Sequence, residues 1–129
     1  MNNATEIGRV GELFAQSLLE RYGIRTAHVD IKGDDLWCKT PRDVFFKVQV
    51  KSCGKPILYA GHHTAPKYNF VTRKVKGYTG VLILVALDKN LLLAKKGTEV
   101  SCNVLKVRPE LFSESSQDKS IVKHFGLKV

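Results

Sequence analysis

The sequence predicts a single α/β domain over residues 1–129, in which an N-terminal helix leads into a mixed central sheet of about five strands. Three observations favour this class. Residues 4–22 carry apolar side chains at helical spacing, and three segments with alternating side chains follow, at 24–30, 35–40 and 44–51. The stretch "GVLILVAL" at 80–87 is apolar throughout, which is typical of a strand buried on both faces.

The N-terminal helix is predicted from its end signals as well as from its spacing. Asn3 is a suitable N-cap, Glu6 completes a capping-box pattern, and Gly23 supplies the left-handed stop. Glu12 lies at the margin of the apolar face, where a carboxylate points along the boundary of the core. At about 100° per residue, that face is formed by Ile7, Val10, Phe14, Ala15, Leu18, Leu19 and Tyr22.

Residues 35–51 are expected to form a β-hairpin that turns at Pro41-Arg42-Asp43. Side chains alternate along a strand, so Val44, Phe46, Val48 and Val50 share one face of the second strand. The other face carries Phe45, Lys47, Gln49 and Lys51. The remaining segments are predicted as a loop at 52–67, short strands at 68–72, 91–96 and 99–107, a basic turn at 73–77 and a helix near 114–126.

The charge balance favours a polyanionic partner. Twenty-one Lys and Arg residues against twelve Asp and Glu give a net charge of +9, and each phosphate neutralised by such a residue releases counterions. The alternative is a basic surface that serves solubility alone. The residues expected to contact nucleic acid are Lys55, Lys67, Arg73, Lys74 and Lys76, the last four interleaved with Tyr68, Phe70 and Tyr78. His62 and His63 are expected to be loop residues that touch phosphate rather than metal ligands.

The cysteines and the N-terminus indicate an intracellular protein. Cys38, Cys53 and Cys102 are widely spaced and odd in number, which argues against a zinc ribbon and a disulfide framework and fits a reducing cytoplasm. The first residues lack the basic and apolar regions of a secretory signal. The apolar stretch at 81–87 is too short to span a bilayer, so no membrane association is expected.

Four polar residues are expected to converge at one end of the hairpin. Asp35 begins the first strand, while Gln49 and Lys51 lie on one face of the second strand, and Glu12 approaches the same edge from the helix. Carboxylate and amide oxygens are ligands for Mg²⁺, and an ammonium group stabilises developing charge on a phosphate. This set suits metal-dependent cleavage of a phosphodiester. The plainer alternative is an edge hairpin with a solvated polar face.

An acid at the start of one strand, followed by Gln-x-Lys on the next, resembles the signature of the PD-(D/E)XK nuclease superfamily. The segment "GRVGE", ending in Glu12, is similar to the first helix of its Holliday-junction-resolvase-like branch. Gln variants of the motif occur in resolvase-like and homing-endonuclease-like members. The resemblance covers residues 5–95 and implies a restriction-endonuclease-like fold with Mg²⁺ as cofactor, for which Mn²⁺ substitutes.

The resemblance also implies a role for each residue. Asp35 and Glu12 are similar to the metal-binding acids, Gln49 to the second strand ligand and Lys51 to the catalytic lysine, with the carbonyl of Val50 as a further metal ligand. Gln49 stands where Glu is commoner and removes one negative charge, so the site depends on Glu12. Asp34 competes with Asp35 for the ligand role. Because the family pattern is an acid directly followed by an apolar strand residue, Asp35 is favoured.

The leading hypothesis is therefore a Mg²⁺-dependent DNA endonuclease, either site-specific and homing-like or junction-specific and resolvase-like. One small domain holds one active site, so cutting both strands implies a homodimer or a higher homo-oligomer. The alternatives are a catalytically weak or inactive nucleic-acid-binding module on the same fold, and a basic scaffold whose hairpin is plain structure. Trp37 is expected to be a core or dimer contact, and the role of the C-terminal segment stays open.

Overall fold

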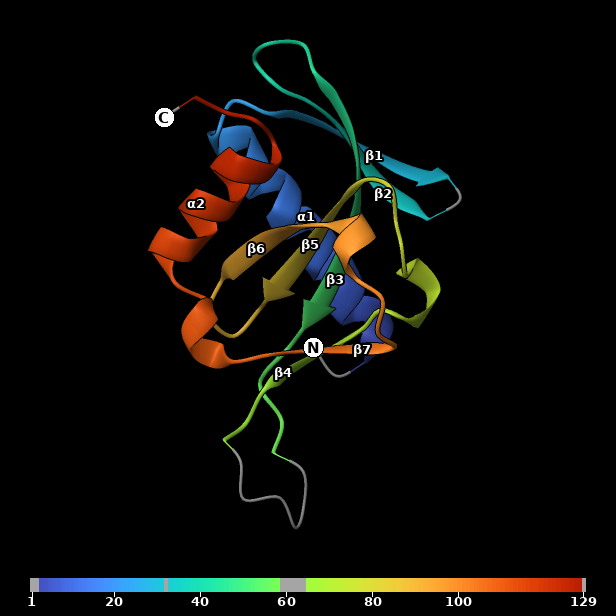
Figure 1. Ribbon diagram of the computed structural model, residues 1–129, viewed down its shortest axis with the longest axis vertical. Coiled ribbons are helices and arrows are strands. Elements are labelled where there is room, and N and C mark those ends of the chain that lie inside the picture. Colours follow the sequence, from blue (N-terminus) through green and yellow to red (C-terminus); the bar gives the residue numbers. More distant parts are fainter. Residues whose placement is uncertain (1–2, 32, 59–64, 129) are drawn as a thin grey trace.

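Two α-helices and seven β-strands make up the computed structural model (Figure 1), which describes residues 3–31, 33–58 and 65–128. The elements are α1 (Ala4–Arg21), β1 (Arg25–Ile31), β2 (Asp34–Lys39), β3 (Phe45–Cys53), β4 (Tyr68–Val71), β5 (Val81–Ala86), β6 (Leu91–Lys96), β7 (Val104–Val107) and α2 (Glu114–His124). Short 3-10 turns at Arg73–Val75, Gly97–Glu99 and Pro109–Leu111 connect the later strands.

The central sheet has five strands in the order β1-β2-β3-β5-β6. Strands β3 and β5 pair in parallel, and the other neighbours pair antiparallel. A mixed five-stranded sheet behind an N-terminal helix was predicted, and both features are confirmed. Strands β4 and β7 form a separate antiparallel pair outside this sheet.

Helix α1 begins and ends where its capping residues indicate. The Asn3 side chain accepts a hydrogen bond from the Glu6 backbone N–H at 2.9 Å, and the Asn3 amide donates to the Glu6 carboxylate at 2.8 Å. Gly23, directly after the helix, has a φ of 80°, which favours glycine because a side chain is strained in that conformation.

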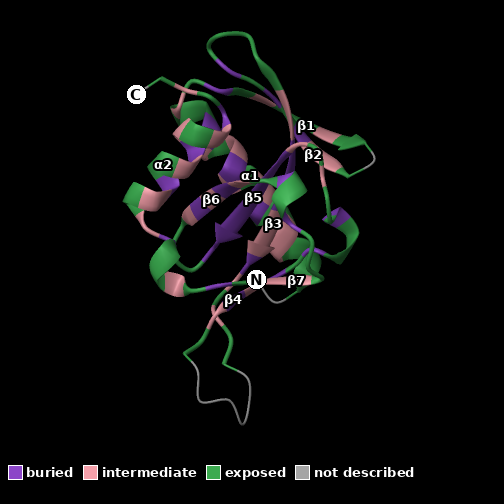
Figure 2. Ribbon diagram, viewed as in Figure 1, coloured by how far each residue is buried: buried purple, intermediate pink, exposed green. Residues whose placement is uncertain are grey.

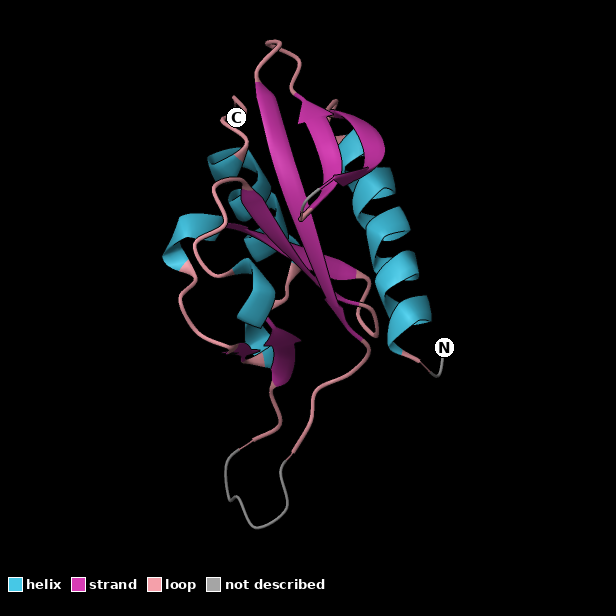
Figure 3. Cartoon of the chain, turned by 90° about the vertical axis from the view of Figure 1, so that its right-hand side faces the viewer, coloured by secondary structure: helices cyan, strands magenta, loops and turns pink. Residues whose placement is uncertain are grey.

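Two apolar cores lie on opposite faces of the sheet. On the α1 side, Ala15 and Leu19 pack against strand residues such as Val48 and Ile83, and α2 adds Ile121. On the other side, β4, β7 and the 3-10 turns cover a second core, whose members are Cys53, Tyr68, Phe70, Val75, Leu82, Leu84, Ala86, Val100, Val107 and Phe112. Figure 3 shows α1 and the β4–β7 pair on opposite sides of the sheet, and Figure 2 shows β5 buried between them.

Gly11 allows α1 to approach β3 closely, directly before Glu12. A Cβ atom at residue 11 would lie 1.6 Å from the Ser52 Oγ atom, so any larger residue pushes the helix away from the strand. We predict that Gly11→Ala lowers the free energy of unfolding by about 1–3 kcal/mol and that Ser52→Gly in the same chain restores part of this loss, as measured by urea denaturation. Gly8→Ala is the matched control, since no atom lies within 4 Å of its added Cβ. Equal losses for both alanine variants would contradict this account.

Three sequence expectations were wrong. The strand predicted at 99–107 begins only at Val104 and pairs with β4 outside the central sheet. Tyr68 and Phe70, expected beside DNA-facing cations, are 0% and 1% exposed, because alternation along β4 turns both rings into the second core. The core position that was one of two roles expected for Trp37 was also wrong, because Trp37 is 37% exposed and faces away from the buried Leu36 and Cys38; the other role, a dimer contact, stays a prediction.

No helix in the described part of the chain is long and apolar enough to cross a membrane.

Candidate active site

A pocket of about 860 Å³ lies between the N-terminal half of α1 and the C-terminal end of β3. Both ends lie low in the view of Figure 1. The pocket contains all four residues that the sequence predicts as catalytic, together with Val50. Its lining is Ala4, Ile7, Gly8, Glu12, Asp35, Gln49, Val50, Lys51, Ser52, Cys53, Gly54, Lys55, Ile57, Leu87 and Asp88.

Asp35 lies where strands β2 and β3 separate. The ladder between them ends at the pair Leu36–Val48, and beyond it the Asp35 carboxylate takes the place of a backbone partner. Its Oδ2 atom accepts hydrogen bonds from the backbone N–H of Val50 and from the Gln49 side-chain amide, both at 2.8 Å. Burial raises the pKa of Asp35, while the bond from Val50 and the charge of Lys51 oppose that shift.

The side-chain oxygen of Gln49 has no hydrogen-bond partner among residues 3–31, 33–58 and 65–128. Gln49 is 8% exposed, its amide nitrogen donates to Asp35, and its Oε1 atom is buried. A buried acceptor left unsatisfied costs about 1–3 kcal/mol, so native proteins seldom keep one without a reason. An amide oxygen of this kind beside a carboxylate is suited to a cation.

Glu12 supplies a second carboxylate at the same pocket. Its side chain is 21% exposed, and one carboxylate oxygen lies 3.5 Å from His28 Nδ1. Burial raises the pKa of Glu12, the negative charge of Asp35 raises it further, and His28 and Arg9 act in the opposite direction. The negative charges of Glu12 and Asp35 therefore repel each other in a partly buried setting. A bound cation would relieve this repulsion.

The backbone of Val50 adds one more oxygen. In a strand, the N–H and C=O groups of one residue point toward the same neighbouring strand. Since the Val50 N–H is directed at Asp35, its carbonyl faces the same edge, where β2 no longer pairs with β3.

These donors fit Mg²⁺ or Mn²⁺ better than zinc. Among the described residues, no group of three or more His, Cys, Asp or Glu side chains is placed to hold a metal. Two carboxylates, an amide oxygen and a backbone carbonyl, by contrast, form an all-oxygen set, which hard cations prefer.

Asp34 is engaged elsewhere and does not compete with Asp35. Its Oδ1 atom accepts the Tyr78 hydroxyl at 2.6 Å and its Oδ2 atom accepts the Trp37 indole N–H at 3.0 Å. Burial, followed by the bond to Asp34, raises the pKa of Tyr78. Asp34 thus ties β2 to the turn before β5, while Asp35 faces the pocket.

The predicted DNA-contacting cations are spread more widely. Lys55 lines the pocket and is exposed. Lys67 is half-buried beside Ile57, Arg73 and Lys74 are exposed on a 3-10 turn, and Lys76 donates to the Asn103 side chain at 2.8 Å. Those four lie outside the pocket lining. His62 and His63 fall outside the described residues.

Sequence reasoning missed His28 and Arg9. His28, on β1, contacts Glu12, on α1. His28, Arg9 and Glu12 also line a second, smaller hollow. No motif marks His28, and Arg9 lies within the segment "GRVGE" but was given no role there. The only signal was that β1 follows α1 directly, which brings its middle residues back alongside the helix.

Among comparisons with family models, curated proteins and solved structures, the match comes from the solved structures. No family model and no curated protein matches this sequence. Among solved structures, a bacterial homing endonuclease (I-Ssp6803I) is similar, with a TM-score of 0.68 and 15% sequence identity over 98% of this chain and 93% of that chain. The likeness spans nearly the whole of both chains and shows that they share a fold.

Proposed function

We propose that the protein is a Mg²⁺-dependent DNA endonuclease with a PD-(D/E)XK-type active site formed by Glu12, Asp35, Gln49 and Lys51. The observation that carries this proposal is the buried Oε1 atom of Gln49, which has no hydrogen-bond partner in the described part of the chain and lies beside Asp35 in a pocket shared with Glu12 and Lys51. The shared fold with a bacterial homing endonuclease supports it.

In this proposal Asp35, Glu12, the Gln49 Oε1 atom and the Val50 carbonyl hold the metal ion. Once bound, Mg²⁺ polarises the phosphate and lowers the pKa of a water molecule. Gln49 contributes an oxygen without a charge, so the two carboxylates provide all of the negative charge from these four donors. The hydrogen bonds from Val50 and Gln49 fix the Asp35 carboxylate, which leaves little side-chain freedom to be lost on metal binding.

Lys51 faces the same pocket from the strand that carries Gln49. Its ammonium group stabilises negative charge that develops on the scissile phosphate and orients the attacking water. The half-buried setting strengthens this interaction, because charges attract more strongly where water is partly excluded.

DNA is the proposed substrate, and a net charge of +9 favours its binding. Lys55, an exposed residue that lines the pocket, would contact a phosphate next to the cut. Both a site-specific and a junction-specific nuclease are compatible with this site. Because each chain provides one active site, cleavage of both strands at one place requires a homodimer or a larger assembly.

The proposal is tested by incubating the purified protein with plasmid, four-way junction and single-stranded DNA, in Mg²⁺ or in EDTA. Cleavage in Mg²⁺ and none in EDTA is expected. Salt-sensitive binding without cleavage of any substrate would indicate instead a nucleic-acid-binding module. Such a module would lack nuclease activity because Gln49 stands where the related motif commonly has a charged Glu.

Metal-free protein is expected to lose stability as pH rises from about 4 to 7. Folding raises the pKa of both Glu12 and Asp35, because burial disfavours their charged forms. At a pH above the ordinary carboxyl pKa of about 4, the folded protein therefore keeps more protons on these two groups than the unfolded chain does. The stabilisation is present below those values and is lost as pH rises through the raised ones. Urea denaturation in EDTA should show a smaller loss in Glu12→Gln than in the wild type, and Mg²⁺ should offset the loss. Identical pH slopes in the two proteins would refute this expectation.

A further inference from the structure

The outward face of β1, β2 and β3 carries aromatic and basic side chains. Residues directly opposite each other on paired strands share a face, and Trp37 lies opposite both Ala27 and Lys47, while Lys39 lies opposite both Arg25 and Phe45. We call this surface the aromatic–basic face; it consists of Arg25, Ala27, Trp37, Lys39, Phe45 and Lys47. The opposite face of the same strands packs against α1.

Two exposed rings lie in the middle of the aromatic–basic face. Trp37 is 37% exposed and Phe45 is 59% exposed, and their ring centres lie 5.8 Å apart in an edge-to-face arrangement. Both rings line a shallow groove of about 240 Å³, together with Arg25 and Lys39. The bond from the Trp37 indole N–H to Asp34 fixes the indole ring, so this surface is formed before any ligand arrives.

The aromatic–basic face continues into the candidate active site. Trp37 lies two residues beyond Asp35 on the same side of β2, and Lys47 lies two residues before Gln49 on the same side of β3. Two residues span about 7 Å of a strand. A polymer that leaves the pocket along the hairpin therefore meets the groove directly.

The charges on this face favour a polyanion over a second copy of the chain. Within the described ranges, the acidic partners of Arg25 and Lys39 are the exposed Glu20 at 4.0 Å and Asp43 at 3.5 Å, and such pairs contribute little and exchange readily. Lys47 lies over the Tyr78 ring. Two copies meeting through this face would bring like charges together, and lysine is depleted in protein interfaces.

We propose that the groove binds unpaired nucleotides of the DNA strand that enters the active site. Their bases stack on Trp37 and Phe45, and their phosphates contact Arg25 and Lys39. Paired bases show only their edges in the grooves of a duplex, whereas an unpaired base offers the flat face that an aromatic ring stacks upon. This inference rests on the proposed DNA endonuclease and narrows its substrates to DNA with unpaired nucleotides next to the cut.

Trp37 is the single tryptophan of the chain, so its fluorescence reports on this groove alone. The intact protein in EDTA is titrated with single-stranded oligo(dT) and, separately, with a duplex of equal length, and the anisotropy of labelled DNA is followed in parallel. Oligo(dT) is expected to quench the emission in step with binding, and the duplex to quench it less.

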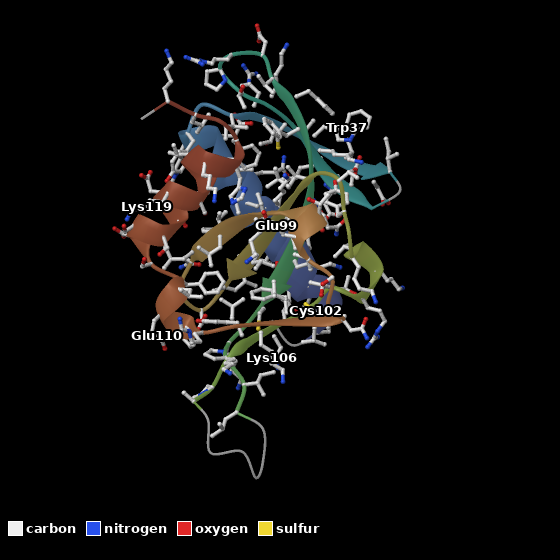
Figure 4. All side chains as sticks on the ribbon, viewed as in Figure 1. Trp37, Glu99, Cys102, Lys106, Glu110 and Lys119 are labelled. Atoms are coloured by element: carbon white, nitrogen blue, oxygen red, sulfur yellow. The ribbon has the colours of Figure 1, made fainter. Side chains whose placement is uncertain are left out.

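Variants locate the effect on the groove. Phe45→Ala and Lys39→Ala should each weaken oligo(dT) binding, the first by about tenfold. Leu111→Ala and Lys119→Ala are the matched controls, since Leu111 is 42% exposed and Lys119 is exposed on α2. In Figure 4, Trp37 and Lys119 lie on opposite sides of the view. Both controls should bind as the wild type does.

Binding of oligo(dT) with unchanged Trp37 emission would overturn the inference. So would an emission change that follows protein concentration without DNA and accompanies a doubled mass in sedimentation, because a second copy would then occupy the face. Metal-dependent cleavage combined with either result would leave the proposed function standing. If neither DNA binds and none is cleaved, both proposals fail together.

Discussion

Lys51→Ala is expected to reduce DNA cleavage by about 100- to 1000-fold while DNA binding stays nearly unchanged. Burial raises the pKa of Asp35, and the ammonium group of Lys51, which lies in the same pocket, opposes that rise; its proposed role is to stabilise charge at the scissile phosphate. The many other cations of the chain are expected to provide the DNA-binding energy. Single-turnover cleavage rates and anisotropy of labelled DNA measure the two effects separately.

Asp35→Asn is expected to reduce cleavage as severely as Lys51→Ala. The asparagine oxygen can still accept a hydrogen bond from the Val50 N–H, which preserves the fold, but the charge proposed to hold the metal is lost. Lys119→Ala removes a positive charge on α2, away from the pocket, and should cleave at the wild-type rate. Wild-type cleavage by Asp35→Asn or Lys51→Ala would show that the active site lies elsewhere.

Gln49→Glu is expected to lower stability in EDTA and to strengthen Mg²⁺ binding about tenfold. The new carboxylate would be almost fully buried beside Asp35, where like charges repel and desolvation is costly. With Mg²⁺ the added charge becomes favourable. A tenfold gain in affinity equals about 1.4 kcal/mol, which adds a few degrees to the metal-induced rise in Tm.

The chain offers a matched control for this substitution. Gln117 is also 8% exposed, and its Oε1 atom accepts the Leu92 backbone N–H at 3.0 Å, outside the pocket lining. Gln117→Glu should lose stability equally with and without Mg²⁺. Thermal denaturation of the wild type and both variants over a range of Mg²⁺ concentrations measures how much Mg²⁺ raises the Tm of each protein. If Mg²⁺ stabilises Gln49→Glu no more than the wild type, Gln49 does not face a metal site.

Local signals in the sequence predicted much of the fold. The N-cap at Asn3, the stop at Gly23 and the alternation along 45–51 depend on neighbouring residues, and each is confirmed. Val44, predicted to share the face of Val48 and Val50, instead lies before β3 and is exposed. The position of Glu12 at the margin of the helix face also follows from helical spacing, and the structure brings it to the pocket that Asp35 lines.

Properties that depend on strand pairing were not predictable in the same way. Alternation shows which residues share a face, but not that the β2–β3 ladder ends at Leu36 and leaves Asp35 to bond with Val50. The interleaving of cations with Tyr68 and Phe70 suggested a DNA contact, although the strand period turns these rings inward. The choice between a core and a contact role for Trp37 stayed open because a single sequence does not show which face of a hairpin α1 will cover.

Soaking crystals of the protein in Mn²⁺ and measuring the anomalous difference density tests the central claim most directly. The account predicts a peak in the α1–β3 pocket within about 2.5 Å of carboxylate oxygens of Asp35 and Glu12 and of the Gln49 Oε1 atom. It also predicts that the peak is absent from Asp35→Asn crystals. A pocket that stays empty at saturating Mn²⁺, or a peak held only by other residues, would contradict the account.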